Sequence, residues 1–307
     1  MAVYVNTNVS SLNGRRYLNN VQNSLTTTYQ RLSSGMRINS AKDDAAGLQI
    51  ADRLTTQING LNQGNRNAND GIALAQTMEG ALDETSNMLQ KIRTLAVQAS
   101  NGTNTDADRQ ALQQEVTSLS TEINRIAGQT KFGGQQILAS AGKGLILANK
   151  TISFQVGANN GDEIAFTALS SGFTISGIAT VSGKIALQGN AADAKNTGLV
   201  KVGTAAARWS VSTADAAKKT LENIDAFIAT VDSKRADLGA FQNRLESSIR
   251  NQSNVSANQA DARSRIRDAD FAEESANLSQ QSIIQQAATS MLMQANSRPQ
   301  LALSMLG

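Results

Sequence analysis

The two ends of this chain both show the repeat of an amphipathic helix, yet they carry almost no charge. No residue between positions 17 and 30 is charged, and between positions 275 and 307 the only charged residue is Arg298. A helix that faces water usually has Lys and Glu opposite its apolar stripe, whereas these two ends have Asn, Gln, Ser and Thr there. We therefore expect both ends to be surrounded by other helices.

The stripes themselves suggest what surrounds them. The N-terminal stripe comprises Leu18, Val21, Leu25, Thr28 and Leu32, and the C-terminal stripe comprises Ile284, Ala288, Met291 and Ala295. Because one small chain cannot enclose both ends, other copies of the same chain are the expected enclosure. The sequence predicts a self-assembling polymer, with the apolar members of the two stripes as candidate self-assembly residues.

Three internal blocks have the three-and-four spacing of coiled-coil-like seams. A helix over about residues 44–99 would be roughly 80 Å long at 1.5 Å per residue. The blocks comprise Met78, Leu82, Thr85, Leu89, Ile92, Ala96 and Ala99; Leu112, Val116, Leu119, Ile123 and Ile126; and Leu221, Ile224, Ile228 and Val231, followed by Leu238, Phe241 and Leu245.

The helical period fades between residues 128 and 203, where thirteen of the 23 glycines lie. Short alternating segments at 151–156, 163–166 and 173–175 are separated by Gly, Asn and Asp, which indicates hairpins. The expected fold is mainly α: long coiled-coil-like helices from both chain ends pack together, with a small β-hairpin-rich insert between them.

Several residues are expected to begin or end helices. Ser40, followed by Asp43 and Asp44, has the pattern of a helix start. Thr105 or Asp106 is expected to cap the second block, and the third is expected to open at Thr213 and Asp215. Pro299, the only proline, is expected to end or interrupt the last helix.

Composition excludes several classes of function. The chain has no Cys, so it has no disulfide and no thiolate metal site. It has no His either, so it has no imidazole base. Its net charge is +3 with only 4% aromatic residues, and its Arg residues are interleaved with acids, which disfavours nucleic-acid binding. We expect no membrane insertion, because no apolar run is long enough to span, and the first residues do not resemble a cleavable Sec signal peptide.

The remaining candidate sites favour structural interpretations. Asp43 and Asp44 could form a catalytic dyad, but helix-start carboxylates are the simpler interpretation. The glycines around Lys143 lack the spacing of a phosphate loop, and Met291 and Met293 suit packing better than metal binding. We expect no enzyme activity, cofactor or metal, while glycosylation of the Ser- and Thr-rich insert stays open.

Residues 30–48, QRLSSGMRINSAKDDAAGL, closely resemble bacterial flagellin. Further matches are VNTN at 5–8, RNANDG at 66–71, FGG at 132–134, RDADFAEE at 267–274, and QAN at 294–296 with Pro299. The resemblance covers about residues 1–140 and 210–307, whereas the insert shows none, as is expected of a family whose outer region varies. The insert is too short for two outer domains, so the chain is similar to a compact form.

The resemblance implies three regions and a set of partners. Residues 1–40 and 266–307 would form a terminal coiled-coil domain, unfolded in the monomer. Residues 41–140 and 205–265 would form a helical rod, and 141–204 a short β-rich variable insert. The flagellar type III apparatus would export the chain without a cleavable signal, to build the extracellular filament used for swimming. An export chaperone would hold the C-terminal helix, and a filament cap and hook-associated proteins would guide assembly.

The family is also recognised by a vertebrate Toll-like receptor. The corresponding motif is QKIRTLAVQ at residues 90–98, with Glu115 on the next helix. The resemblance gives Lys91, Leu95, Gln98 and Glu115 as candidate recognition residues. Lys91 stands where the receptor-binding form has Arg, and Thr94 where it often has Glu. Because Lys lacks the planar fork of Arg, we expect recognition to be weakened.

Four alternatives stay open. A hook–filament junction protein or a minor flagellin would share the terminal motifs, although the match across 30–140 disfavours the junction protein. A flagellin-like surface protein that binds a carbohydrate or a receptor is another alternative. Its sign would be an aromatic sugar platform, for which only Phe154, Phe166, Phe173 and Trp209 are available. An enzyme carried in the insert could not be a His-ligated metalloprotease, because the chain has no His.

Overall fold

The computed structural model describes residues 7–138, 145, 151–167, 172–182, 198–200 and 207–304, with side chains as far as residue 297. The chain divides into two compact units, one of residues 1–59 with 255–307 and the other of residues 60–254. The boundary falls within two long helices, α2 (Ala45–Ala99) and α6 (Ala214–Arg267). Each unit is described by itself below.

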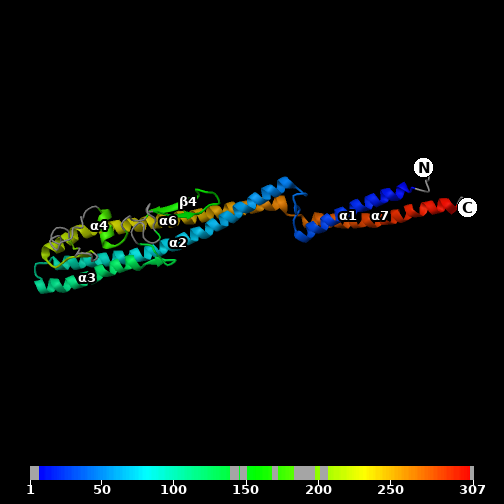
Figure 1. Ribbon diagram of the computed structural model, residues 1–307. Coiled ribbons are helices and arrows are strands. Elements are labelled where there is room, and N and C mark those ends of the chain that lie inside the picture. The colour runs from blue at the N-terminus through cyan, green and yellow to red at the C-terminus, as the bar shows by residue number, and fades with distance from the viewer. Residues whose placement is uncertain are drawn as a thin grey trace. The chain divides into compact units, whose positions relative to one another are not determined.

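In the first unit, helices from opposite ends of the chain lie side by side (Figure 1). These are α1 (Val9–Ser34) and α7 (Phe271–Ser304). Contacts between Asn8 and Ala295 and between Arg31 and Glu274 show that the two helices are antiparallel. Asn8 caps α1 by accepting the Ser11 amide at 3.0 Å, and Gly35 ends it at a φ of 69°, which glycine adopts without strain.

A short backbone ladder holds the chain where α1 ends and α7 begins. Met36 and Asp268 form an antiparallel bridge, and the Arg37 amide donates to the Arg267 carbonyl at 2.7 Å. The Ala269 amide donates to the Gly35 carbonyl at 3.0 Å. These bonds fix the antiparallel register of the helix pair, because they satisfy backbone groups that the helices leave free at their ends.

The start of α2 corrects one detail of the sequence prediction. Asp44, not Ser40, caps the helix, because its side chain accepts the Gly47 amide at 2.9 Å. Asp43 instead closes the preceding turn by accepting the Ser40 and Asn39 amides. The two acids therefore have separate structural roles, and the sequence pattern misplaced the cap by a single turn of chain.

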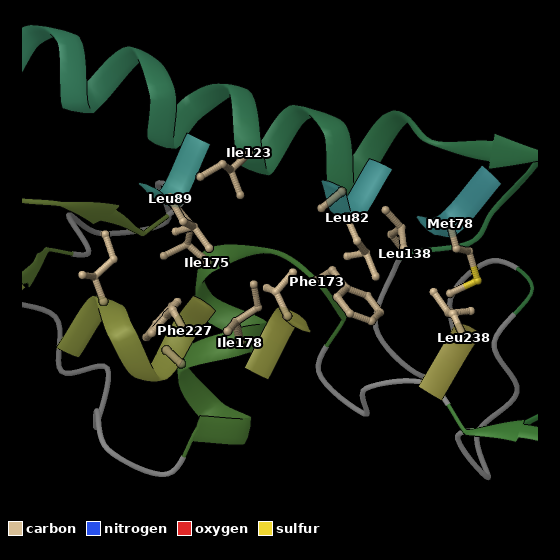
Figure 2. Close-up of a cluster of buried hydrophobic side chains, with 14 of the residues drawn as sticks. Met78, Leu82, Leu89, Ile123, Leu138, Phe173, Ile175, Ile178, Phe227 and Leu238 are labelled. Atoms are coloured by element: carbon tan, nitrogen blue, oxygen red, sulfur yellow. The ribbon is translucent and has the colours of Figure 1, made fainter. Parts of the chain in front are cut away.

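In the second unit, the predicted stripe of α2 is the centre of the core, where Met78, Leu82 and Leu89 lie among buried side chains of other elements (Figure 2). All seven residues predicted in this block, from Met78 to Ala99, are at most 2% exposed. They pack against α3 (Asp106–Gln129) and α6. Helix α3 contributes Val116 and Ile123 to this core, and α6 contributes Phe227 and Leu238. Thr105 caps α3 in a capping box with Asp108, and Thr213 accepts the Ala216 amide at the start of α6, as predicted.

Small antiparallel pairs and one short helix complete the described part of this unit. The pairs are β1 (Lys131–Phe132) with β2 (Gln135–Gln136), β3 (Thr151–Gln155) with β4 (Glu163–Thr167), and β5 (Leu199–Val200) with β6 (Arg208–Trp209). The β3–β4 hairpin confirms the predicted strands. The strand expected at residues 173–175 was wrong: Thr174 accepts the Gly177 amide and starts α4 (Ile175–Ser182).

The fold is mainly α with small β pairs, as the sequence predicts, but the last helix differs. Pro299 was expected to end or interrupt it, yet α7 continues to Ser304. A proline inside a helix removes one backbone hydrogen bond, and the helix continues on both sides of this position. Among the described residues, no helix is long and apolar enough to cross a membrane.

We predict that Leu82→Ala lowers the free energy of unfolding by about 3 kcal/mol, because it leaves a cavity in a fully buried seam. Val97→Ala removes a comparable apolar group from the same helix at a site that is 50% exposed, and should change stability by less than about 0.5 kcal/mol. Chemical denaturation followed by circular dichroism measures both. Equal losses in the two variants would contradict a core centred on this stripe.

Candidate functional site

The first candidate site is the pair of terminal helices, and the predicted self-assembly residues lie mostly in the seam between them. Val21, Leu25 and Ala288 are buried in this chain, at 9%, 6% and 6% exposure. The half-buried members are Leu18, Leu32, Ile284 and Ala295. Met291 differs, because 72% of it is exposed. The two ends thus cover each other's stripes, and only part of the predicted surface is left for other copies.

Polar contacts of three kinds cross the seam and set its register. The Asn8 side-chain amide donates to the Ala295 carbonyl at 2.7 Å, and the Thr28 hydroxyl donates to Gln281 at 3.4 Å. Near the other end Arg31 pairs with Glu274 at 3.0 Å, where the Glu274 side chain is only 8% exposed. A buried carboxylate is costly without its partner, so this pair disfavours any other register.

The outward faces of the two helices carry large apolar side chains that nothing in this chain covers. Among the described residues of α1 and α7 these are Val9, Leu12, Tyr17, Tyr29, Phe271, Ile283, Met291 and Met293, each more than half exposed. Sequence reasoning missed most of them because they lie outside the three-and-four stripe. The expectation that Met291 and Met293 pack is not met within this chain.

A groove of about 970 Å³ lies between residues 10–17 of α1 and residues 284–297 of α7. Gly14 forms part of its floor, where an added Cβ would lie 3.2 Å from Leu292. The groove is lined by Ser10, Asn13, Gly14, Tyr17, Ile284, Ala287, Ala288, Met291, Gln294, Ala295 and Ser297. Its lining is uncharged, so it suits an apolar or amide-bearing side chain rather than an ion.

The second candidate site is the exposed face shared by α2 and α3. Lys91 and Glu115 form an ion pair of 2.7 Å between the two helices, with 58% and 44% of their side chains exposed. Gln98 is exposed one helical turn beyond Leu95, and its carbonyl accepts the Asn104 side chain at 2.6 Å. Leu95 is only 8% exposed and belongs to the core. The structure therefore brings Lys91 and Glu115 together and leaves only the edge of Leu95 accessible.

Carboxylates near the starts of α2 and α3 serve as turn and cap groups. Hydrogen bonds from the Ser40 and Asn39 amides lower the pKa of Asp43 below its usual value. The Thr105 hydroxyl and amide do the same for the pKa of Asp108. Among the described residues no three acids, His or Cys gather closely enough to hold a metal. The Lys143 segment lies outside the described residues.

The aromatic residues of the insert region form core contacts rather than a sugar-binding platform. Trp209 is fully buried with its ring edge-on to Phe227 at 4.7 Å, and Phe173 is 1% exposed. Phe154 and Phe166 lie 5.7 Å and 5.6 Å from the ring of Phe241. A platform for sugars needs exposed ring faces, so these residues give no support to a carbohydrate-binding protein.

Comparison with known proteins identifies the family. The bacterial flagellin N-terminal helical region matches residues 5–143, and the bacterial flagellin C-terminal helical region matches residues 221–306. Flagellin D of Vibrio anguillarum is 39% identical over 377 aligned positions, which cover the whole of both chains. The chain belongs to the bacterial flagellin family. Flagellin B of Vibrio cholerae, 38% identical over 376 positions with the same full coverage, agrees.

These matches confirm the resemblance found in the terminal motifs. The unmatched stretch, residues 144–220, contains all but the first three residues of the predicted insert. The alignments are longer than this chain, so the relatives contain positions that this flagellin lacks. A structure from Vibrio parahaemolyticus, described as a flagellar hook-associated protein, has a TM-score of 0.55 and 17% identity. It covers 74% of this chain and 100% of its own, and at that identity it shows a shared fold alone.

Membership of this family makes the chain a structural protein of the flagellar filament, which is an extracellular polymer of identical subunits. The relatives named above are flagellins that align over the full length of the chain, which supports a filament subunit. This role agrees with the paired ends of the chain, because a filament subunit needs surfaces that repeat from one copy to the next.

We predict that Asp108→Asn lowers the melting temperature at neutral pH, and that the difference from the unchanged protein vanishes in strong acid. Because the pKa of Asp108 is lower in the folded protein, its stabilising effect is complete above the ordinary value of 3.8 and is lost as the pH falls through the folded value. Thermal unfolding across this pH range measures it. Asp106→Asn is the control, since it removes a charge from the same turn without the Thr105 bonds. Equal effects of the two variants would contradict the role assigned to the capping box.

Proposed function

We propose that this flagellin assembles through the outward faces of its paired terminal helices, and that each subunit reaches the growing end by flagellar type III export. The observation that carries the proposal is the coincidence of a sparsely charged helix pair with a set of exposed large apolar side chains. Such surfaces are unfavourable in water and mark sites of association.

We propose that assembly uses the regions expected from the sequence. Residues 1–40 and 266–307 would be the terminal coiled-coil domain, 41–140 and 205–265 the helical rod, and 141–204 the variable insert. The α1–α7 seam, with Val21, Leu25 and Ala288 inside, gives each subunit one rigid two-helix element. Met291 and the other exposed residues then contact neighbouring copies, and the uncharged groove accepts their side chains.

The energetics favour repeated contacts over a single strong one. Burying apolar surface contributes about 25 cal/mol per Å², so each exposed Ile or Met adds roughly 1.5–3 kcal/mol when fully covered. With few charges in either helix, covering these surfaces requires little charge desolvation. The same contacts recur along a helical lattice, and the polymer is held by their sum.

We predict that Ile283→Lys prevents filament growth while leaving the rest of the fold intact, because it places a charge on a side chain that is 67% exposed in α7. Gln280 is also exposed on α7, so Gln280→Lys is the control for added charge. It should assemble more readily than Ile283→Lys. Deleting residues 278–307 should give soluble monomer. Electron microscopy after seeding measures growth, and filaments of normal length from Ile283→Lys or from the deletion would reject the proposal.

The partners follow from the same surfaces. An export chaperone would cover the apolar face of α7, where Ile283, Met291 and Met293 are exposed, before the chain leaves the cell. A filament cap would guide each subunit, and hook-associated proteins would provide the first layer on which subunits assemble. The role in swimming motility rests on this assembly.

We also propose that the exposed face of α2 and α3 is a ligand for the vertebrate flagellin-sensing Toll-like receptor. Support comes from the motif at residues 90–98 and from the surface pair of Lys91 and Glu115 beside the edge of Leu95. Because Lys offers a point charge rather than a planar fork, and is already engaged by Glu115, recognition of this chain would be weaker than that of an Arg-bearing form.

We predict that Lys91→Arg increases the response of a receptor reporter cell line to monomeric protein, because Arg can contact Glu115 and the receptor with separate nitrogens. Glu115→Ala and Leu95→Ala should lower it. Arg125→Lys is the control, since it changes the same chemistry beside Glu122 on α3. Circular dichroism would confirm that each monomer is folded. If none of the folded monomers gives a response, receptor recognition is rejected.

A further inference from the structure

The chain contains Asn-Gly pairs in two different backbone settings. Asn13-Gly14 lies within α1 and Asn59-Gly60 within α2. Asn101-Gly102 lies in the turn between α2 and α3, and Asn160-Gly161 lies in the turn between β3 and β4. Asn is a thermally labile residue, and a following Gly removes the steric barrier to attack on its side chain.

The reaction needs only water. The Gly amide nitrogen attacks Cγ of the Asn and forms a new C–N bond, while the side-chain amide leaves as ammonia with the proton that the backbone nitrogen loses. The product is a five-membered succinimide. Water then adds to one of its carbonyls and opens the ring, which gives either Asp or isoaspartate, whose main chain runs through the β-carbon.

Asn160-Gly161 is the pair whose surroundings leave this attack unhindered. Both residues are exposed at the tip of the hairpin. Among the described residues none forms a hydrogen bond with the Asn160 side chain or with the Gly161 amide. Gly161 has a φ of 93°, in the region that favours glycine. The reacting atoms therefore need not break any contact before they meet.

The residues on either side of this pair are firmly held. The Asn159 amide donates to the Asp162 carboxylate at 3.0 Å, and the Asn159 carbonyl accepts the Gln155 side chain at 2.6 Å. The Val156 amide donates to the Asp162 carbonyl at 2.9 Å. The Gly161 carbonyl is also held, because it accepts the Glu163 amide at 2.8 Å. Freedom is thus confined to the Asn160 side chain and the Gly161 amide, which sets this tip apart from a loop that is loose throughout.

Asn59 provides an internal comparison, because it is exposed, as Asn160 is, but lies within a helix. In a helix the Gly60 amide is bonded to the carbonyl four residues earlier, and the backbone holds it away from Cγ of Asn59. Exposure is common to both sites, so backbone geometry is what separates them.

Asn101 has an intermediate setting. Its side-chain oxygen accepts the Thr103 amide at 3.5 Å, and its carbonyl accepts Arg109 at 3.2 Å. Arg109 also donates to the carbonyls of Ala99 and Asn104 and is itself only 13% exposed, which holds this turn in place. Reaction at Asn101 therefore requires this anchored turn to rearrange.

We propose that Asn160-Gly161 is a site of spontaneous deamidation that converts the hairpin turn to an aspartyl or isoaspartyl form. The change adds a negative charge next to Asp162 and Glu163. The isoaspartyl form also lengthens the turn by one carbon where the hairpin lies against α2: a Cβ on Gly60 would lie 2.7 Å from Ala158, and one on Gly64 would collide with the Val156 carbonyl. The hairpin is too closely packed to take up the longer main chain, so it loosens from the helix.

The test is to age the folded full-length protein in mildly alkaline buffer, digest it, and follow each Asn-Gly peptide by mass spectrometry with separation of isoaspartyl forms. Asn160 should react at least about tenfold faster than Asn59, because the helix must first open locally. In denaturant the two rates should converge. Comparable rates at Asn59 and Asn160 in the folded protein, or no reaction at Asn160, would overturn the proposal.

A matched variant separates the chemistry from general ageing. Asn160→Gln keeps an amide but requires a larger ring, so the aged peptide should remain unmodified at this position. Hydrogen exchange over residues 151–167 should increase in the aged protein and stay unchanged in aged Asn160→Gln. Equal increases in both proteins, or none after Asn160 has reacted, would reject the loosening of the hairpin.

Discussion

The contact on which the second unit depends is the burial of one face of α2 against α3 and α6. From Met78 to Ala99 this face is closed to water. It is built from Leu, Ile, Ala and Met, so many small contacts replace a few aromatic ones. Ion pairs such as Arg93 with Asp225 and Arg235 with Asp83 lie at its margins with partly exposed side chains. Such pairs contribute little energy and serve mainly to align the helices.

The terminal helices follow the same packing principle with different chemistry on their outer faces. In the second unit charges line the seam, whereas in α1 and α7 most outward positions are amides, hydroxyls or large apolar groups. The Arg31–Glu274 pair is the only ion pair between these two helices among the described residues. It lies near the backbone ladder at Met36 and Asp268, so register is set at one end, while charges farther along α1, at Arg15 and Arg16, are exposed and few. That arrangement suits a polymer, because neighbouring copies can cover much of the helices while burying little charge.

The two proposed interaction surfaces differ in whether their side chains already have partners within the folded chain. The outward apolar side chains of α1 and α7 have nothing over them in this chain, which makes association favourable in itself. The Lys91–Glu115 pair, by contrast, is complete before any partner arrives. A receptor that binds there must compete with this contact, and so recognition depends on how much of each side chain remains accessible. The hairpin on α2 adds a third kind of surface, whose close packing makes it sensitive to a change of one atom in its turn.

The sequence by itself determined the long helices, the α2 stripe, the caps at Thr105 and Thr213, the β3–β4 hairpin and the flagellin family, because these depend on local spacing and on motifs contiguous in the chain. Only the tertiary structure decided that Val21, Leu25 and Ala288 face the opposite end of the same chain while Met291 faces outward, that Leu95 is largely buried, and that Phe173 precedes a helix rather than lying in a strand. Periodicity shows that a helix has an apolar face. It cannot show which of several apolar faces will cover it, because that choice depends on contacts between residues more than two hundred positions apart.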